Sequence, residues 1–530
     1  MRTRLAALRA EQAELEATLR KLERQQASAR SNDRHPALDA NEPAVTASSS
    51  SAEKVALFRR LSAGRTDIFP ARWDNRKTGR SGYSPACANE WAKGVCGKPQ
   101  IKCGECPHQA FIPVSDEVID KYLRGGNGRH RAAGDFVAGI YPLLTDETCW
   151  FLAADFDKQD WAVDALAMID TCHVKGVPAA LERSRSGNGG HVWIFFAAPI
   201  SARIARQLGA AIMTETMERR PEIGFGSYDR FFPSQDTMPL GGFGNLIALA
   251  LQGRARVNRN SVFIDRNLRP YDDQWAFLSS LPRLAPEQAS EMVAEAERRG
   301  TVLSVRMPVD DEDADEPWRM TPSRRRELRP IDIPLPENVG IVVADQLYVD
   351  RTELPPALTA RVIRLAAFQN PEFYRSQAMR LPTFGKPRII SCAELHPRHV
   401  GLPRGCLDEA VELLRVHGAE AAVEDLRTTG SPFSRKVCFR GTLHDSQVKA
   451  FDALAPHDYG VLAAPPRSAK RSWPLRSSLC GRVTRSFSFI AASCSPSGSS
   501  GSGHSLTSIP RKSALSEGDA KNLRASSMSR

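Results

Sequence analysis

The sequence predicts a mixed α/β fold, of the α+β kind, and three observations favour it. Between residues 52 and 299, apolar strand-like runs alternate with amphipathic helix-like segments. One apolar run ends in Asp155 and Asp157, and a glycine-rich turn leads into another run at His191. Because the chain has 530 residues, we expect this region to be one of two or three separate cores.

The elements of this region follow from hydrophobic periodicity. Apolar residues that alternate or run together over a few positions predict strands, and repeats near 3.6 residues predict amphipathic helices. The predicted strands are 150–156, 191–196 and 245–251, and the predicted helices are 161–175, 202–219 and 286–299.

Residues 1–27 carry a heptad pattern and predict a helix. The pattern suits a short coiled coil, and therefore self-association, but a solitary solvated helix fits it as well. Residues 28–52 are rich in Ser and Ala without periodicity, so we expect a disordered linker. The leucines at the a and d positions are Leu5, Leu8, Leu15, Leu19 and Leu22, with Gln12 and Gln26 at two further a positions.

The charge balance points to a polyanionic partner. The net charge is +11 and the isoelectric point is near 9.2, which composition alone cannot assign to nucleic acid or to a membrane surface. No apolar run approaches the roughly eighteen residues of a spanning helix, and no signal peptide is evident. We therefore expect a soluble, cytoplasmic protein without a membrane partner, in which cysteines stay reduced.

Four cysteines lie close together in the sequence. The spacing is Cys87-x8-Cys96-x6-Cys103-x2-Cys106, among Gly, Pro and Lys residues. Four thiolates close a tetrahedral zinc site with no open position, so we predict a structural zinc knuckle at 87–106. An iron–sulfur cluster or four unligated thiols are the alternatives.

Asp155 and Asp157 predict a divalent cation site. Their side chains share one face of a strand end, and Mg²⁺ or Mn²⁺ takes oxygen ligands while leaving room for substrate phosphates. A pair of solvated carboxylates is the simpler interpretation of the same pattern. Two ions require a third carboxylate, for which we favour Asp229 with Asp236 as the alternative, because both precede another strand.

The glycine-rich turn before His191 predicts phosphate binding. Backbone N–H groups in such a turn can cradle an anion, and an imidazole can donate to a phosphate oxygen. A satisfied core histidine and plain surface arginines are the alternatives. With the carboxylates, the turn suggests metal-assisted nucleotidyl transfer. The candidate nucleotide-binding residues are Ser186, Gly187, Asn188, Gly189 and His191, with Arg183 and Arg185.

These residues, in this order, resemble the archaeo-eukaryotic primase superfamily, and more closely the primase–polymerase of the TOTE conflict systems. The resemblance implies an RRM-like catalytic core within residues 53–300 and template-dependent nucleotide polymerisation. It implies that Asp155, Asp157 and Asp229 hold two metal ions while His191 binds the phosphates of the incoming nucleotide. The matching stretches are Arg80-Ser-Gly-Tyr-Ser-Pro-Ala-Cys-Ala-Asn89, Cys103-Gly-Glu-Cys106, Ala153-Ala-Asp-Phe-Asp157, Glu182-Arg-Ser-Arg-Ser-Gly-Asn188, Phe232-Pro-Ser-Gln-Asp236 and Gly242-Phe-Gly-Asn245.

In those systems the primase is fused to a superfamily 2 helicase. After a charged linker at 301–335, residues 336–465 resemble the start of that helicase, with Gln447 ahead of its phosphate-binding loop. Residues 466–530 lack periodicity and predict a disordered tail. One permitted codon choice for 466–474, shifted by one base, encodes Thr-Ala-Phe-Gly-Lys-Thr-Val-Val-Ala. We therefore expect a frameshift that truncates the helicase and abolishes its ATPase activity.

The function predicted from the sequence is a DNA primase/polymerase of a mobile-element or phage conflict system. Its partners would be a DNA or RNA template and nucleoside triphosphates, and its cofactors two Mg²⁺ or Mn²⁺ ions with a structural Zn²⁺. A metal-dependent nuclease could use the same carboxylates. A non-catalytic nucleic-acid-binding protein would bind DNA with strong salt dependence and show no turnover.

Overall fold

The computed structural model describes residues 45–75, 78–125, 135–157, 159–303, 305, 335–427 and 444–454. It divides into two compact units, one formed by Met1–Pro336 with Arg351–Val400 and the other by Glu337–Asp350 with Gly401–Arg530. The predicted helix at 1–27, most of the predicted linker at 301–335 and the tail at 466–530 lie outside the described residues. The predicted domain boundaries at 300 and 336 remain predictions.

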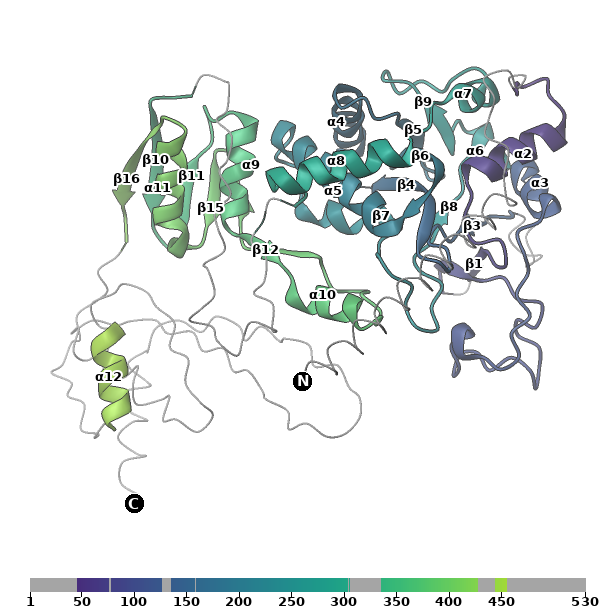
Figure 1. The fold of residues 1–530 in the computed structure, drawn as a ribbon, viewed down its shortest axis with the longest axis horizontal. Coiled ribbons are helices and arrows are strands. Elements are labelled where there is room, and N and C mark those ends of the chain that lie inside the picture. Colours follow the sequence, from purple (N-terminus) through teal and green to yellow (C-terminus); the bar gives the residue numbers. More distant parts are fainter. Residues whose placement is uncertain are drawn as a thin grey trace, which may run out of the picture. The chain divides into compact units, whose positions relative to one another are not determined.

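A five-stranded sheet forms the centre of the first unit (Figure 1). Its order is β7-β4-β6-β5-β9, and each neighbouring pair is antiparallel. The middle strands are almost continuously apolar, because both of their faces are covered. The strands are β4 (Thr148–Phe156), β5 (Ala180–Arg183), β6 (Gly190–Ser201), β7 (Phe231–Phe232) and β9 (Val262–Ile264).

Three helices pack with this sheet, and all three were predicted from the sequence. They are α4 (Trp161–Val174), α5 (Ala202–Arg219) and α8 (Pro286–Arg299). α5 begins directly after β6 and buries a broad face against β4, while α8 packs on α5 and β6 (Figure 1). The prediction of a mixed helix and sheet fold is confirmed, and the RRM-like description stays a prediction.

The predicted strand at 245–251 is reduced to the two residues of β8 (Ile247–Ala248). β8 pairs only with β3 (Gly139–Ile140), which is equally short. Leu251 has a φ of +61°, a left-handed conformation that a strand cannot contain. The predicted strand was too long because the apolar residues continue to Leu251, whereas the strand ends at Ala248.

The N-terminal part of the first unit begins with α2 (Ser51–Leu61), where Ser50 and Glu53 form a reciprocal capping box. This cap explains why the helix already includes the last two residues of the linker predicted at 28–52. The β1–β2 hairpin and α3 follow, and the cysteine cluster lies between them. The bounds are β1 (Pro70–Asn75), β2 (Arg80–Pro85), η1 (Cys103–Glu105) and α3 (Asp116–Arg124).

The rest of the first unit includes a segment distant in sequence. Residues 367–391, which we call the arm, consist of β12, α10 and β13; β12 and β13 pair antiparallel. α9 packs on α5, and β13 contacts η2. The bounds are η2 (Phe225–Asp229), α6 (Gly253–Val257), α7 (Gln274–Ser280), α9 (Pro356–Leu365), β12 (Ala367–Gln369), α10 (Pro371–Ala378), β13 (Ile389–Ser391) and β14 (Glu394–Leu395).

In the second unit β10 pairs antiparallel with β11 and parallel with β16, and α11 packs against β16. No helix in the part of the chain that the structure describes has the length and apolarity to cross a bilayer. The bounds are β10 (Asn338–Val343), β11 (Leu347–Asp350), β15 (His399–Leu402), η5 (Arg404–Cys406), α11 (Leu407–Val416), β16 (Glu420–Asp425) and α12 (Asp445–Leu454).

Candidate active site

Three polar residues form a row across β4, β6 and β5, the three middle strands of the main sheet, near one end of these strands. Asp155 on β4 is the register partner of His191 on β6, and His191 is the register partner of Glu182 on β5. Residues directly opposite one another in antiparallel strands point to the same face. The sheet therefore brings Asp155, His191 and Glu182 side by side at its end.

Glu182 is the anchor of this row. Its side chain is only 1% exposed, and its Oε2 accepts from Trp193 Nε1 at 2.8 Å and lies 2.9 Å from His191 Nδ1. A carboxylate only accepts, so His191 Nδ1 carries the proton and Nε2 faces Asp155 Oδ1, 3.7 Å away. Burial alone would lower the pKa of His191, but Glu182 and Asp155 together raise it above its ordinary value.

Asp155 and Asp157 converge on one cationic group, the guanidinium of Arg230. Arg230 Nη1 lies 3.3 Å from Asp155 Oδ2 and 2.5 Å from Asp157 Oδ2. Burial raises the pKa of Asp155, and the charge of Asp157 adds to it, while His191 and Arg230 oppose the shift. Two carboxylates that already share a cation have the donor chemistry that Mg²⁺ or Mn²⁺ prefers.

The candidate third carboxylates lie apart from this pair. Both oxygens of Asp229 accept from the backbone N–H of Arg388 at 3.1 Å, and burial raises the Asp229 pKa. Asp236 pairs with Arg206 at 2.8 Å and accepts from Gln377. Among the described residues, no three His, Cys, Asp or Glu side chains are close enough together to hold a metal ion. The third ligand therefore stays a prediction.

The glycine-rich turn closes between β5 and β6 beside the row. Ser184 N–H donates to the Gly189 carbonyl at 2.8 Å, and Gly187 N–H donates to the Ser184 carbonyl at 3.0 Å. Gly187 has a φ of +81°, which requires glycine in practice. Asn188 N–H is already engaged by Ser186 Oγ at 3.3 Å. Ser186, Gly187, Asn188 and Gly189 thus lie in one tight turn next to His191.

The two arginines of this segment differ in their surroundings. Arg183 donates to the carbonyls of Leu268 and Arg259, at 2.6 and 3.2 Å, which holds its guanidinium on the neighbouring loop. Arg185 influences the pKa values of Asp74 and Tyr83, so it lies near the β1–β2 hairpin. Their contact with a nucleotide remains a prediction.

Residues 53–292 match the family model of the archaeo-eukaryotic primase domain of TOTE conflict systems. This primase-like domain contains every candidate site residue named above except Arg388 and Gln377 of the arm. The match supports a nucleotidyltransferase of the primase/polymerase kind, and it ends before the predicted helicase region. No curated protein matches the chain.

The cysteine cluster of the primase-like domain is less closed than a zinc site. The structure shows no disulfide at any of the four thiols, and all four are partly exposed: Cys87, Cys96, Cys103 and Cys106. Cys106 N–H approaches the Cys103 carbonyl at 3.5 Å, as in a tight knuckle turn. No three of the four thiols lie close enough together for a metal, within the residues that are described. Zinc binding stays a prediction from the spacing.

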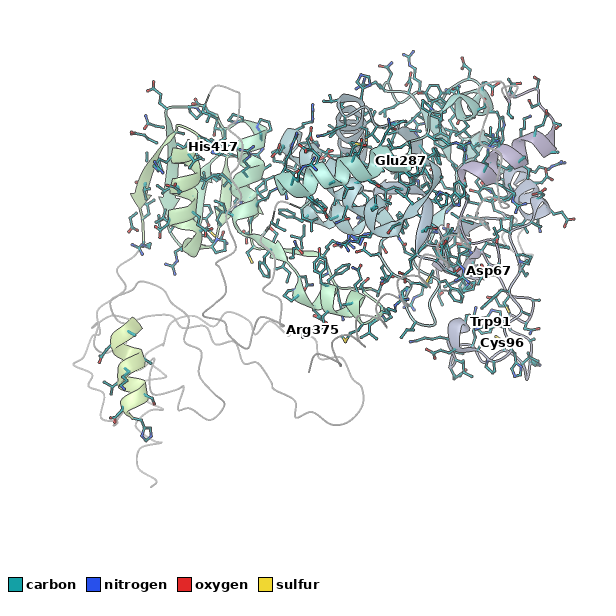
Figure 2. The ribbon with its side chains drawn as sticks, in the orientation of Figure 1. Asp67, Trp91, Cys96, Glu287, Arg375 and His417 are labelled. Carbon is teal, nitrogen blue, oxygen red and sulfur yellow. The ribbon has the colours of Figure 1, made fainter. Side chains whose placement is uncertain are left out.

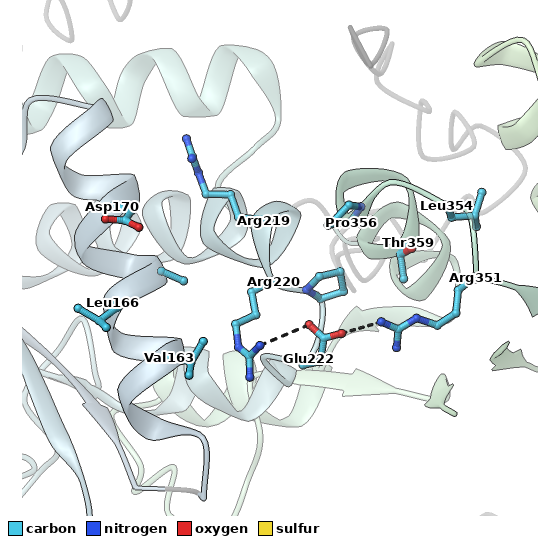
Figure 3. Close-up of a pocket in the computed structure, with 12 residues that line it drawn as sticks. Val163, Leu166, Asp170, Arg219, Arg220, Glu222, Arg351, Leu354, Pro356 and Thr359 are labelled. Atoms are coloured by element: carbon cyan, nitrogen blue, oxygen red, sulfur yellow. Dashed lines mark hydrogen bonds and ion pairs between the residues drawn. The ribbon is translucent and has the colours of Figure 1, made fainter. Parts of the chain in front are cut away.

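A cavity of about 380 Å³ in the first unit lies elsewhere. It is bounded by α4, the end of α5 and the start of α9, and no candidate site residue lines it. Arg220 and Arg351 approach Glu222 from two sides, as Figure 3 shows. Arg351 pairs with Glu222 at 2.6 Å, and Arg220 pairs more closely with Asp164 than with Glu222, so both arginines have acidic partners and we assign no catalytic role to this cavity.

Two residues of the site were not identified from the sequence, Glu182 and Arg230. A signal existed for Glu182, because it is a lone carboxylate inside the apolar strand Ala180-Leu-Glu-Arg183. An isolated buried carboxylate needs a donor partner, and His191, nine residues further along the chain, is one candidate. Arg230 gave no such signal, because only the pairing of β7 with β4 brings it to Asp155.

Proposed function

We propose that this chain is a template-dependent nucleotidyltransferase, a DNA primase/polymerase that serves a conflict system of a mobile element or phage. The observation that carries the proposal is the row of Asp155, His191 and Glu182, with Asp157 and Arg230 at its edge. Carboxylates beside an anchored imidazole and a glycine-rich turn are the groups that nucleotidyl transfer requires. The match of residues 53–292 supports the same class.

Asp155 and Asp157 would hold Mg²⁺ or Mn²⁺, and we retain two ions as the proposed number. Divalent ions bound there would activate a primer hydroxyl and neutralise charge on the triphosphate. Asp229 would join them only by giving up the Arg388 backbone N–H. Arg230 would leave the two carboxylates as a metal ion binds, and its guanidinium could then pair with a phosphate.

The remaining roles belong to the chain's own polar groups. With His191 Nδ1–H directed to Glu182, Nε2 is the atom left to contact a phosphate oxygen. The N–H groups of Gly187 and Asn188 would complete that contact only by exchanging their present bonds within the turn for bonds to the anion. The four cysteines would hold a structural zinc ion that fixes residues 87–106, and residues 336–465 would be the start of a helicase.

A primer-extension assay tests the proposal. Full-length protein is incubated with a labelled primer annealed to a longer template, with deoxynucleotides or ribonucleotides and with Mg²⁺ or Mn²⁺. We expect the labelled strand to lengthen to the template end in a metal-dependent reaction. Shortened strands would indicate a nuclease, and retained but unchanged strands would indicate a binding protein; either result would reject the proposal.

A further inference from the structure

Three segments of the first unit expose large apolar side chains. They are the cysteine knuckle at 87–106, the loop at 236–243 and the tip of the arm. Single exposed apolar residues are common, but a cluster of them marks an interaction site. We call this set the strip; its members are Trp91, Val95 and Ile101 in the knuckle, Leu240 in the loop, and Met379, Leu381 and Phe384 in the arm.

Direct contacts join the three segments. Leu240 N–H donates to the carbonyl of Arg380 at 3.1 Å, which ties the loop to the arm. A Cβ atom on Gly104 would overlap the carbonyl oxygen of Gly241, so knuckle and loop backbones touch. Gln377 donates to Asp236 at 2.9 Å and adds a second tie between arm and loop. The three segments that carry the strip therefore lie next to one another.

Two aromatic side chains of the strip are exposed to solvent. Phe384 is 98% exposed, and Trp91 is 59% exposed within the knuckle, where Figure 2 labels it with Cys96. Trp91 also has a φ of +62°, an unfavourable conformation for a bulky residue. Lys98 Nζ lies 5.7 Å from the Trp91 ring centroid, so a cation already rests on the ring. An exposed aromatic held in strained backbone is a common sign of a binding role.

The charge around the strip is predominantly basic. Lys93 and Lys102 of the knuckle are exposed, with Glu105 4.0 Å from Lys102. Arg375, labelled in Figure 2, and Arg380 are exposed on the arm. Arg380 pairs with Glu147 at 2.9 Å but keeps half of its side chain exposed. Lysines and arginines interleaved with exposed aromatic rings are the combination that single-stranded nucleic acids bind, because bases stack while phosphates pair with cations.

The strip lies near the opposite end of β4 from Asp155. β7 pairs antiparallel with Ala153 and Ala154, so the chain leaves β7 away from Asp155, and Met238 N–H in the loop donates to Glu147, just before β4 begins, at 3.2 Å. A nucleic acid strand bound on the strip would have to span about 25 Å, roughly the length of β4, to reach the carboxylates. We propose that the strip binds the single-stranded template, with Trp91 and Phe384 stacking on bases. This inference rests on the proposed nucleotidyl transfer and extends its site beyond residue 292.

The test measures binding separately from catalysis. Fluorescence anisotropy follows a labelled single-stranded thymidine oligonucleotide as full-length wild type, Trp91→Ala or Phe384→Ala is added, without nucleotides, over a range of salt. We expect each variant to bind about tenfold more weakly, since stacking on one aromatic ring contributes on that order. We expect Lys102→Ala to weaken binding and to reduce the salt dependence by about one phosphate contact.

Val257→Ala is the matched control, because Val257 is 82% exposed on α6 and lies outside the three segments. Unchanged affinity in both aromatic variants would overturn the inference. So would a change in sedimentation behaviour without a change in oligonucleotide affinity, which would indicate a protein partner. Circular dichroism melting confirms that each variant is folded. If the wild-type protein binds the oligonucleotide through the strip but does not extend primers, only the catalytic proposal is rejected.

Discussion

Glu182 shows how one buried residue can organise the candidate site. A carboxylate that is 1% exposed is strongly unfavourable unless it accepts hydrogen bonds, and here it receives the Trp193 indole and the His191 imidazole. The same contacts fix which imidazole nitrogen carries the proton. Orientation of His191 thus follows from the need to satisfy Glu182, before any substrate is considered.

Glu182→Ala tests this dependence. The Trp193 and His191 donors would lose their acceptor in a buried place, so we expect the free energy of unfolding of the first unit to fall by about 2–4 kcal/mol. Urea unfolding followed by tryptophan fluorescence measures the loss. Glu182→Gln keeps an acceptor oxygen and should lose distinctly less. Equal stability of Glu182→Ala and the wild type would show that the contacts contribute little.

Glu182→Gln separates the effect of Glu182 on the position of the His191 imidazole from its effect on folding. A folded Glu182→Gln variant should keep the KM for the primer–template while kcat decreases about tenfold or more, because the imidazole is no longer held by a charged partner. Steady-state primer extension measures both constants. An unchanged kcat would limit Glu182 to a structural role.

Among the elements, the β5–β6 junction determines the site geometry. Gly190 begins β6, and a Cβ at this position would lie 2.6 Å from the Trp161 ring and 2.9 Å from the Glu182 carbonyl oxygen. Only a hydrogen atom fits between β5 and α4 at this point. The close approach keeps Glu182 and His191 in register.

Gly190→Ala should therefore disturb the site through the sheet. We expect destabilisation of about 1–3 kcal/mol from overpacking, together with a loss of extension activity larger than the loss of stability explains. Thermal melting and primer extension on the same preparation measure the two effects. Gly226→Ala is the control, because no atom lies within 4 Å of a Cβ there. Similar effects of the two substitutions would contradict the steric account.

The elements also show what the sequence could predict. The helices at 161–175, 202–219 and 286–299 and the strand ending at Asp155 were found because their apolar residues repeat regularly. The strand at 245–251 was too long, since hydrophobicity does not reveal the left-handed backbone of Leu251. Asp155 and His191 are register partners at one end of the sheet, and their joint role with Asp157 in one site stays a prediction. The positions of Asp229 and Arg230 depend on pairing across 75 residues of sequence, which periodicity cannot encode.

At the scale of the whole molecule, the first unit extends well beyond the matched primase-like domain. Arg388 of the arm is 1% exposed and donates to the carbonyls of Ser234 and Tyr228, at 2.7 and 3.1 Å. The Cζ atom of Arg388 lies 4.5 Å from the centroid of the Phe373 ring. Burial and the nearby positive charge of Arg206 lower the pKa of Arg388 to about 9. The arm thereby holds the segment that carries Asp229, although it lies about one hundred residues further along the chain than the end of the match.

Removing the Arg388 side chain should loosen that segment. In Arg388→Ala, two carbonyls lose donors and a cavity opens, so we expect hydrogen exchange at 228–236 to accelerate at least tenfold. Hydrogen exchange with mass spectrometry on the full chain measures this directly. Arg375→Ala, an exposed position on the same arm, is the control. Equal exchange in both variants would mean that the arm does not restrain the Asp229 segment.

The central claim is that Asp155 and Asp157 are the metal-dependent catalytic pair, and one measurement tests it most directly. Primer extension by the Asp155→Asn, Asp157→Asn double variant is compared with wild type across Mg²⁺ and Mn²⁺ concentrations. We expect extension to fall by at least a thousandfold at every concentration, with unchanged melting temperature and oligonucleotide affinity, since a neutral amide cannot replace the anionic ligand. Extension at the wild-type rate by the folded double variant would contradict the account.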